Sequence, residues 1–79
     1  MITFYACIRD EITGALIIED LECEIEVYRT SRNEFTIEDV RVDGSSLYRG
    51  TILSHLIAAQ VEEQAYADDD FVGKALSDE

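Results

Sequence analysis

The segment LECEIEVYR, residues 21–29, alternates apolar and acidic residues with a period of two. This period predicts a β-strand with one buried and one exposed face. The buried side would carry Cys23, Ile25 and Val27. The exposed side would carry three carboxylates and no cation, at Glu22, Glu24 and Glu26. Like charges along one sheet face repel each other, so the sequence leaves two interpretations: a solvated face, or a surface for a cationic partner.

Strands are predicted on both sides of this segment. Residues 2–8 (ITFYACI) alternate and are followed by the turn RDEITG, and residues 34–42 (EFTIEDVRV) follow the turn TSRN. Pairing Ile8 with Ile17 would set apolar residues against each other nearly throughout, with Glu19 opposite Ala6 as the misfit. In the third strand the alternation slips, and a β-bulge near Glu38 and Asp39 would return its apolar residues to the core.

From Thr51 the period changes to that of a helix. Thr51 is a suitable N-cap. The residues that follow have the i, i+3, i+4 spacing of a helix that buries one stripe: Ile52, Leu53, Leu56, Ile57, Gln60 and Val61. Asp70 would cap a short last helical turn over residues 71–76. The sequence therefore predicts an α+β fold: a three-stranded antiparallel β-meander with one helix and a short C-terminal helical turn packed on one face. One domain would span residues 1–79, with a core of Phe4, Ile8, Leu21, Ile25, Val27, Phe35, Ile37, Leu53, Ile57 and Val61.

The charge of the chain restricts its partners. Among 79 residues, 18 are acidic and 6 are basic, which gives a net charge of -12. Phosphate groups of nucleic acids and anionic membrane surfaces would be repelled. A basic protein surface is the partner that this charge favours, with an attraction that weakens in salt.

Catalytic and metal-binding patterns are weak. His55 stands beside Ser54 on the predicted helix, where adjacent residues point about 100° apart, so they do not form a nucleophile–base pair. Cys7 and Cys23 would lie on opposite faces of the sheet. The segment DDDFVGKALSDE matches a calcium loop in part, but Val72 stands where an oxygen ligand is needed. We expect no enzyme activity, metal or cofactor.

Several residues are candidates for partner binding. Tyr5, Tyr28 and Ile18 would share the exposed sheet face with the three glutamates, and the aspartates Asp68, Asp69 and Asp70 form a second acidic group. The first strand carries no charge within residues 2–8, so we expect any homodimer to form through this edge strand. The N-terminal segment MITFYACIRDE lacks the features of a signal peptide, and the apolar runs are too short to span a bilayer, so a soluble intracellular protein is expected.

The run ECEIEVYRTSRNEFTIEDVRVDGSSL followed by ILSHLIAAQVEEQA resembles small phage-encoded proteins. The layout of an acidic strand pair, a VRVDG exit and a terminal acidic helix is similar to that of anti-CRISPR proteins, in particular inhibitors of type I-C complexes. The resemblance implies a DNA-mimicking inhibitor in the host-cell cytoplasm that binds subunits of a CRISPR effector and blocks its hold on target DNA. Two alternatives remain open: a phage structural or assembly accessory protein acting through self-association by Ile18 and Tyr28, or an acidic antitoxin.

Overall fold

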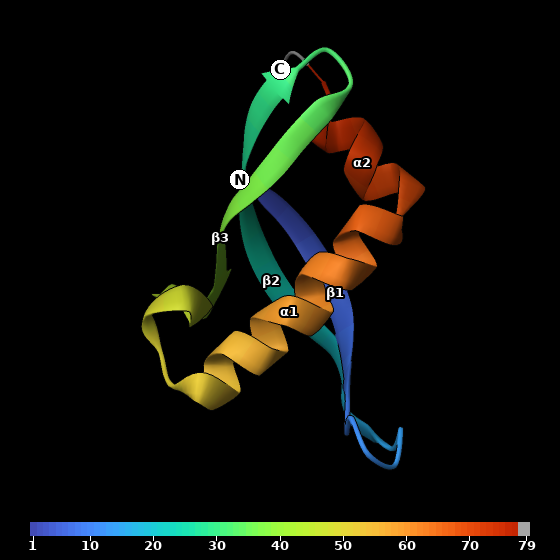
Figure 1. The fold of residues 1–79 in the computed structure, drawn as a ribbon, viewed down its shortest axis with the longest axis vertical. Helices are drawn as coiled ribbons and strands as arrows, with labels where there is room; N and C mark the ends of the chain where they lie inside the picture. Colours follow the sequence, from blue (N-terminus) through green and yellow to red (C-terminus); the bar gives the residue numbers. More distant parts are fainter. Residues whose placement is uncertain (78–79) are drawn as a thin grey trace.

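The computed structural model describes residues 1–77 of the chain (Figure 1). The elements in order are β1 (Ile2–Arg9), β2 (Leu16–Ser31), β3 (Glu34–Val42), β4 (Ser45–Ser46), the 3-10 turn η1 (Leu47–Arg49), α1 (Ile52–Ala67) and α2 (Asp69–Ala75). The strands form one antiparallel sheet in the order β1-β2-β3-β4. The predicted α+β meander with a helix on one face is confirmed, and β4 adds a two-residue fourth strand.

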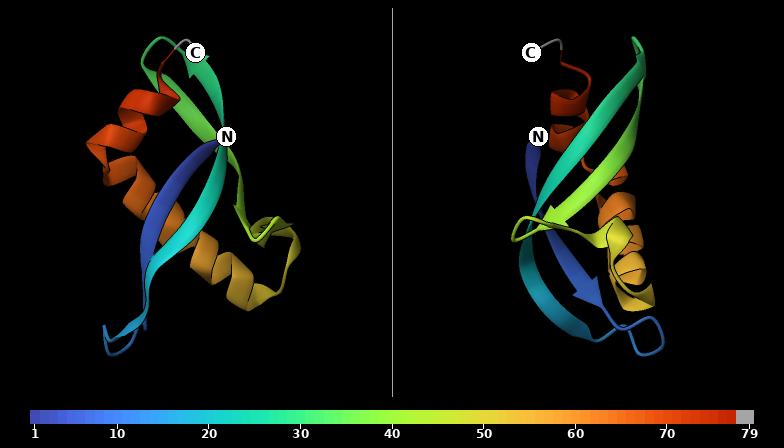
Figure 2. Two further views of the ribbon diagram at one scale, coloured as in Figure 1. Left: turned by 180° about the vertical axis from the view of Figure 1, so that it is seen from behind. Right: turned by 90° about the vertical axis from the view of Figure 1, so that its left-hand side faces the viewer.

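The long strand β2 joins two hairpins that extend in opposite directions (Figure 2). Its first part, from Leu16 to Ile25, pairs with β1, and its last part, from Glu24 to Ser31, pairs with β3. The three strands therefore lie side by side only around Glu24 and Ile25. Beyond β3, Asp43 and Gly44 both have positive φ, as a tight hairpin turn requires, and the chain returns as β4.

The predicted register of β1 on β2 was wrong by two residues from Ile2 to Ala6 and by one residue at Ile8. Phe4 lies opposite Cys23, and Ala6 opposite Leu21. Between the Ala6–Leu21 pair and the Ile8–Ile18 pair, β1 advances by two residues and β2 by three, so β2 carries a bulge at Glu19 and Asp20. The bulge removes the misfit of Glu19 against Ala6, because both acidic residues leave the regular ladder and stay exposed.

The predicted bulge in β3 is confirmed. Glu26 lies opposite Asp39 and the next residue, Val27, opposite Ile37, so Glu38 is the extra residue. The apolar residues on both sides of the bulge consequently face the core: Phe35, Ile37, Val40 and Val42.

The helix α1 begins where the sequence predicts, but only the later part of the predicted stripe, at Ile57 and Val61, packs on the core. The Thr51 hydroxyl accepts a hydrogen bond from the backbone N–H of Ser54 at 3.4 Å, which confirms the N-cap. The buried residues are Ala58, Val61 and Ala65. Leu53, predicted to be in the core, is 66% exposed, because the first turns of α1 extend past the sheet core and only the later turns pack on it.

Two glutamines of α1 pair with the outer edge of β1. The Gln64 side chain accepts from the Cys7 N–H at 2.9 Å and donates to the Cys7 carbonyl at 2.6 Å. Gln60 does the same at Arg9, at 2.9 and 2.8 Å. Alternate residues of a strand direct their backbone groups to the same edge, so Thr3 and Tyr5 point theirs outward as well. Half of this edge is therefore covered, and a homodimer through β1 could use only the N-terminal half.

The helix α2 starts two residues earlier than predicted. Asp68, not Asp70, is its N-cap, with the carboxylate accepting from the Phe71 N–H at 2.9 Å. Phe71 anchors α2, with its ring centroid 5.5 Å from that of Phe4 and 6.0 Å from that of Phe35.

Within the part of the chain that the structure describes, no helix is long and apolar enough to cross a membrane.

The core has one centre, between the sheet and both helices. Of the predicted core residues, four are buried and five are partly buried against them: Ile8, Ile25, Ile37 and Val61, and then Phe4, Leu21, Val27, Phe35 and Ile57. Three further buried residues, Ala6, Cys23 and Val40, lie on the strand faces that the sequence assigned to the core. The prediction missed the buried helix residues Ala58, Ala65, Phe71 and Ala75.

Candidate docking face on the open side of the sheet

The three glutamates of β2 form an exposed row, as predicted. Glu22, Glu24 and Glu26 are all exposed, whereas the residues between them, Cys23 and Ile25, are fully buried. Carboxylates two residues apart on a strand recur about every 6.8 Å. The row crosses the centre of the sheet, where β1, β2 and β3 lie side by side.

Two tyrosines flank the row at its two ends. Tyr5 on β1 lies opposite Glu22, and Tyr28 follows Glu26 on the same side of β2, opposite Thr36. The side chains are 57% and 61% exposed. Each presents a large ring and a hydroxyl to solvent beside a carboxylate, which is the combination that Tyr brings to protein interfaces.

Strand β3 adds a carboxylate and a cation that the reading of β2 alone had missed. Asp39 lies opposite Glu26 and Arg41 opposite Glu24. The Arg41 Nε donates to Asp39 at 2.8 Å, and the Ser46 hydroxyl donates to the other Asp39 oxygen at 2.5 Å. The prediction that no cation stands in the row holds for β2 but not for the assembled face. The signal was available: once the bulge turns Val40 and Val42 inward, Asp39 and Arg41 must point outward.

The charges of this face influence one another. Burial raises the pKa of Asp39, but the hydrogen bonds from Ser46 and Arg41 outweigh it and leave the pKa below its usual value. The pKa of Arg41 is raised by the hydrogen bond to Asp39 and by its charge, with smaller effects of Glu26 and Glu24. Arg41 is therefore held by the carboxylates around it, and the face as a whole keeps an excess of negative charge.

The thiol beneath the row is poorly ionised. Burial, and then the charge of Glu22, raise the pKa of Cys23 to about 11. Cys23 is fully buried and Cys7 half-buried, and both cysteines are free thiols.

Ile18 does not belong to this face. The prediction placed it beside the glutamates, but the bulge at Glu19 and Asp20 reverses the direction of the side chains that precede it. Ile18 pairs with Ile8 and is partly buried against the core. It is therefore not a candidate contact residue, which also removes it from the self-association surface that the sequence predicted.

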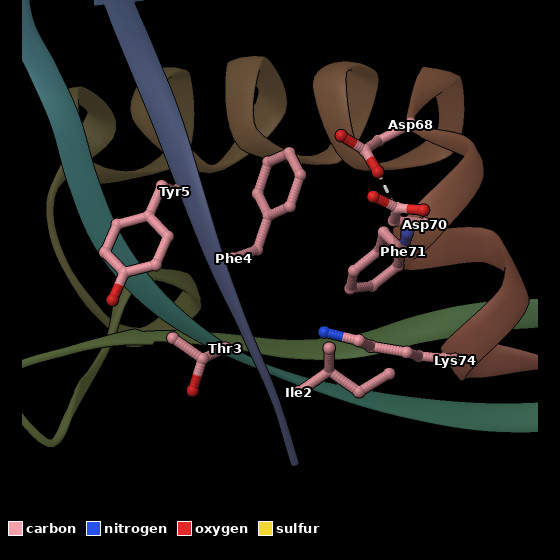
Figure 3. A pocket seen from close by; sticks show the side chains of 8 residues that line it. All are labelled: Ile2, Thr3, Phe4, Tyr5, Asp68, Asp70, Phe71 and Lys74. Atoms are coloured by element: carbon pink, nitrogen blue, oxygen red, sulfur yellow. Dashed lines mark hydrogen bonds between the residues drawn. The ribbon is translucent and has the colours of Figure 1, made fainter.

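The second acidic group lies across the β1 edge. Asp68 and Asp70 line a hollow of about 210 Å³ together with Thr3, Tyr5 and Lys74 (Figure 3). In this view the Tyr5 ring points to the opposite side of β1 from the aspartates, and the Lys74 side chain extends toward Ile2. Asp68 has a structural role as the cap of α2, and Asp69 and Asp70 stand in the first helical turn, where a negative charge is favourable. Tyr5 thus adjoins both acidic groups, but the groups occupy different surfaces.

Hydrogen bonds link three polar residues of η1 and α1: His55, Tyr48 and Glu62. His55 bonds through Nε2 to the Tyr48 carbonyl at 2.8 Å, and the Tyr48 hydroxyl donates to Glu62 at 2.6 Å. Burial, followed by this bond to Glu62, raises the pKa of Tyr48. Among residues 1–77 there is no group of three potential metal ligands, and Glu79, the last position of the calcium-loop pattern, lies outside the described residues.

Comparison of the chain with protein-family models, curated proteins and solved structures found no match. The resemblance to anti-CRISPR proteins stays an expectation from the sequence.

Proposed function

We propose that the protein is an inhibitory binding protein whose open sheet face docks on a basic protein surface that normally holds nucleic acid. The observation that carries this proposal is the row of Glu22, Glu24 and Glu26 on an exposed face over a fully buried layer. The fold holds these carboxylates on a regular strand, so the row is preorganised, and a docking partner need not order it.

The spacing of the carboxylates favours a partner surface that normally binds the phosphates of nucleic acid. One strand of a duplex presents a phosphate per about 3.4 Å of helix axis, and the row presents a carboxylate about every 6.8 Å. Asp39 raises the charge density beside the row, while Arg41 reduces it. The face therefore has the sign of a nucleic-acid backbone at a lower linear density, so the flanking Tyr5 and Tyr28 would have to contribute contact area to a stable complex.

The resemblance supports a particular target. RNA-guided effector complexes hold duplex and displaced strands in positively charged channels and read a short motif beside the target. A compact acidic protein seated in such a channel excludes target DNA without any chemical step. We accordingly propose a type I CRISPR effector, type I-C first, as the partner.

A gel-shift experiment tests this function. A purified type I-C effector with its guide RNA is incubated with the protein and then with matching double-stranded DNA. The expected result in the gel is loss of the shifted DNA band. On size-exclusion chromatography of the same mixture, the protein should co-elute with the effector. A full DNA shift at a large excess of the protein, with no co-elution, would contradict the type I-C target. Affinity capture from cells that carry other effectors would then ask whether the docking face binds a different basic partner.

A further inference from the structure

A second exposed surface lies on the helix side of the molecule and is apolar. A hollow of about 260 Å³ joins the β1–β2 hairpin to the first turns of α1. It brings together four large aliphatic side chains, which we call the apolar patch: Ile12, Ile17, Leu53 and Leu56. Ile12 is 95% exposed and Leu53 66% exposed, so the patch is not part of the monomer core, which is completed further along α1 by Ala58, Val61 and Ala65.

The hairpin holds its part of the patch in place. The Asp10 carboxylate accepts from the N–H groups of Ile12 and Thr13 at 2.8 and 2.9 Å. The Asp10 N–H donates to the Ala15 carbonyl at 2.9 Å, and the Gly14 N–H donates to the Asp10 carbonyl at 2.8 Å. The turn is thus closed by its own hydrogen bonds and presents Ile12 to solvent. Grouped exposed aliphatic residues of this kind mark interaction surfaces.

The charge distribution indicates what covers the patch. Residues 45–61, which include the first turns of α1, contain no Asp or Glu, although the chain has 18 acidic residues, and they contain Arg49. The hairpin side of the hollow carries both signs, with Arg9 beside Asp10 and Glu11. This is a region where two chains of net charge -12 can approach each other, while the glutamate row stands on the other face of the sheet.

We propose that the apolar patch is the interface of a homodimer, with a second copy of this chain as its occupant. A two-fold axis places the patch of one copy against the same patch of the other. Leu53 and Leu56 of the two α1 helices then pack together, and Ile12 of each hairpin covers the partner helix. Arg9 of each copy meets the acidic hairpin residues of the other, so the rim is self-complementary. The dimer leaves both docking faces exposed.

Salt separates this interface from the docking face. Two copies of net charge -12 repel each other at long range, and raising the ionic strength from about 0.01 M to about 1 M shortens the Debye length from about 30 Å to about 3 Å. Dimerisation through an apolar patch should therefore strengthen with salt. Docking of the acidic face on a basic partner should weaken over the same range.

Sedimentation equilibrium of the purified chain tests the proposal. The expected result is a reversible monomer–dimer equilibrium whose dissociation constant falls as salt is added. The variant Ile12→Gln/Leu53→Gln changes no charge and removes two exposed side chains, so it should keep the native circular dichroism and raise the dissociation constant about tenfold or more. Tyr5→Gln/Tyr28→Gln is the matched control: it removes two similarly exposed side chains from the sheet face and should leave the dimer unchanged.

Three outcomes would overturn the proposal. The first is a monomer at all salt concentrations up to about 1 mM protein, a range in which weak specific dimers still form. The second is a dimer that persists in Ile12→Gln/Leu53→Gln, which would place the interface elsewhere, for example at the open half of the β1 edge. The third is a dimer that dissociates in the tyrosine control. The first two outcomes do not bear on the acidic docking face, since no basic partner is present in the experiment. The third would place that face in the dimer interface.

Discussion

The glutamine side chains that cover the β1 edge permit a prediction at the level of single amides. Gln64 makes two hydrogen bonds with the Cys7 backbone in a partly buried setting, and Gln60 makes two with Arg9 in an exposed one. A hydrogen bond contributes about 0.5–1.5 kcal/mol net. The variant Gln64→Met keeps the length of the side chain and loses both bonds. It should lower the free energy of unfolding by about 1–3 kcal/mol, and Gln60→Met by about 1 kcal/mol or less, because water can replace the lost bonds there.

Urea denaturation measures the two losses, and amide hydrogen exchange assigns them to residues. In Gln64→Met the Cys7 amide should exchange faster while the Arg9 amide keeps its protection, and Gln60→Met should show the reverse. The Thr3 and Tyr5 amides serve as internal references, because they point to the same edge and should exchange fast in the parent protein. Unchanged protection of Cys7 in Gln64→Met, together with an unchanged urea midpoint, would refute the assignment of Gln64 as an edge cover.

Two further predictions concern stability. Ile25→Ala should lower the free energy of unfolding by about 2–5 kcal/mol because Ile25 is fully buried, whereas Leu53→Ala should stay within about 0.5 kcal/mol; equal losses in urea denaturation would show that the helix face is assigned wrongly. The pKa of Asp39 is lowered in the folded protein, so the stability that Asp39 contributes is complete above the ordinary aspartate pKa and is lost as the pH falls through the folded pKa. Asp39→Asn should therefore melt below the parent at pH 7, and the difference should shrink as the pH falls below about 4. A difference that stays constant with pH would contradict this.

The sequence predicted the positions of the strands and helices better than it predicted how the strands pair and which side of each element is buried. Alternation predicted β3 with its bulge, because Ile37 and Val40 could not otherwise share one face. The bulge in β2 had a signal too, in the misfit of Glu19 against Ala6, but a single misplaced carboxylate was not enough to predict a shift of register. Its consequence was the wrong side for Ile18. A single extra residue reverses every side chain beyond it.

The helix face was misassigned in the first turns of α1, because several of the residues that pack on the core are small. Ala58 and Ala65 bury fully, and small side chains let α1 approach the sheet, yet alanine contributes little to an apolar periodicity. Gln60 and Gln64 bond to backbone groups 51 and 57 residues away in the chain, and no local pattern encodes such a partner. The exposed Leu53 and Leu56 had given the stronger periodic signal.

For the open face of the sheet, the sequence predicted the residues contributed by β1 and β2 but missed those contributed by β3. The glutamate row and the positions of Tyr5 and Tyr28 follow from strand alternation alone. Arg41 and Asp39 enter only when β3 is placed beside β2, since cross-strand neighbours depend on register. Which protein binds this face depends also on the surface of that protein, so only a binding experiment can identify it.

The central claim, that the glutamate row is the docking surface, is tested most directly by two charge-matched triple variants. Glu22→Lys/Glu24→Lys/Glu26→Lys reverses the row. Glu11→Lys/Glu63→Lys/Asp69→Lys makes the same change in net charge at three exposed positions in the hairpin and the helices. With both variants shown to be folded by circular dichroism, the measurement is the binding of each to the type I-C effector, read as inhibition of target-DNA binding. We predict that the row variant loses inhibition and the control variant retains it. Equal inhibition by the row variant and the parent would contradict the claim, and loss of inhibition in the control variant alone would move the docking surface to the hairpin and helices.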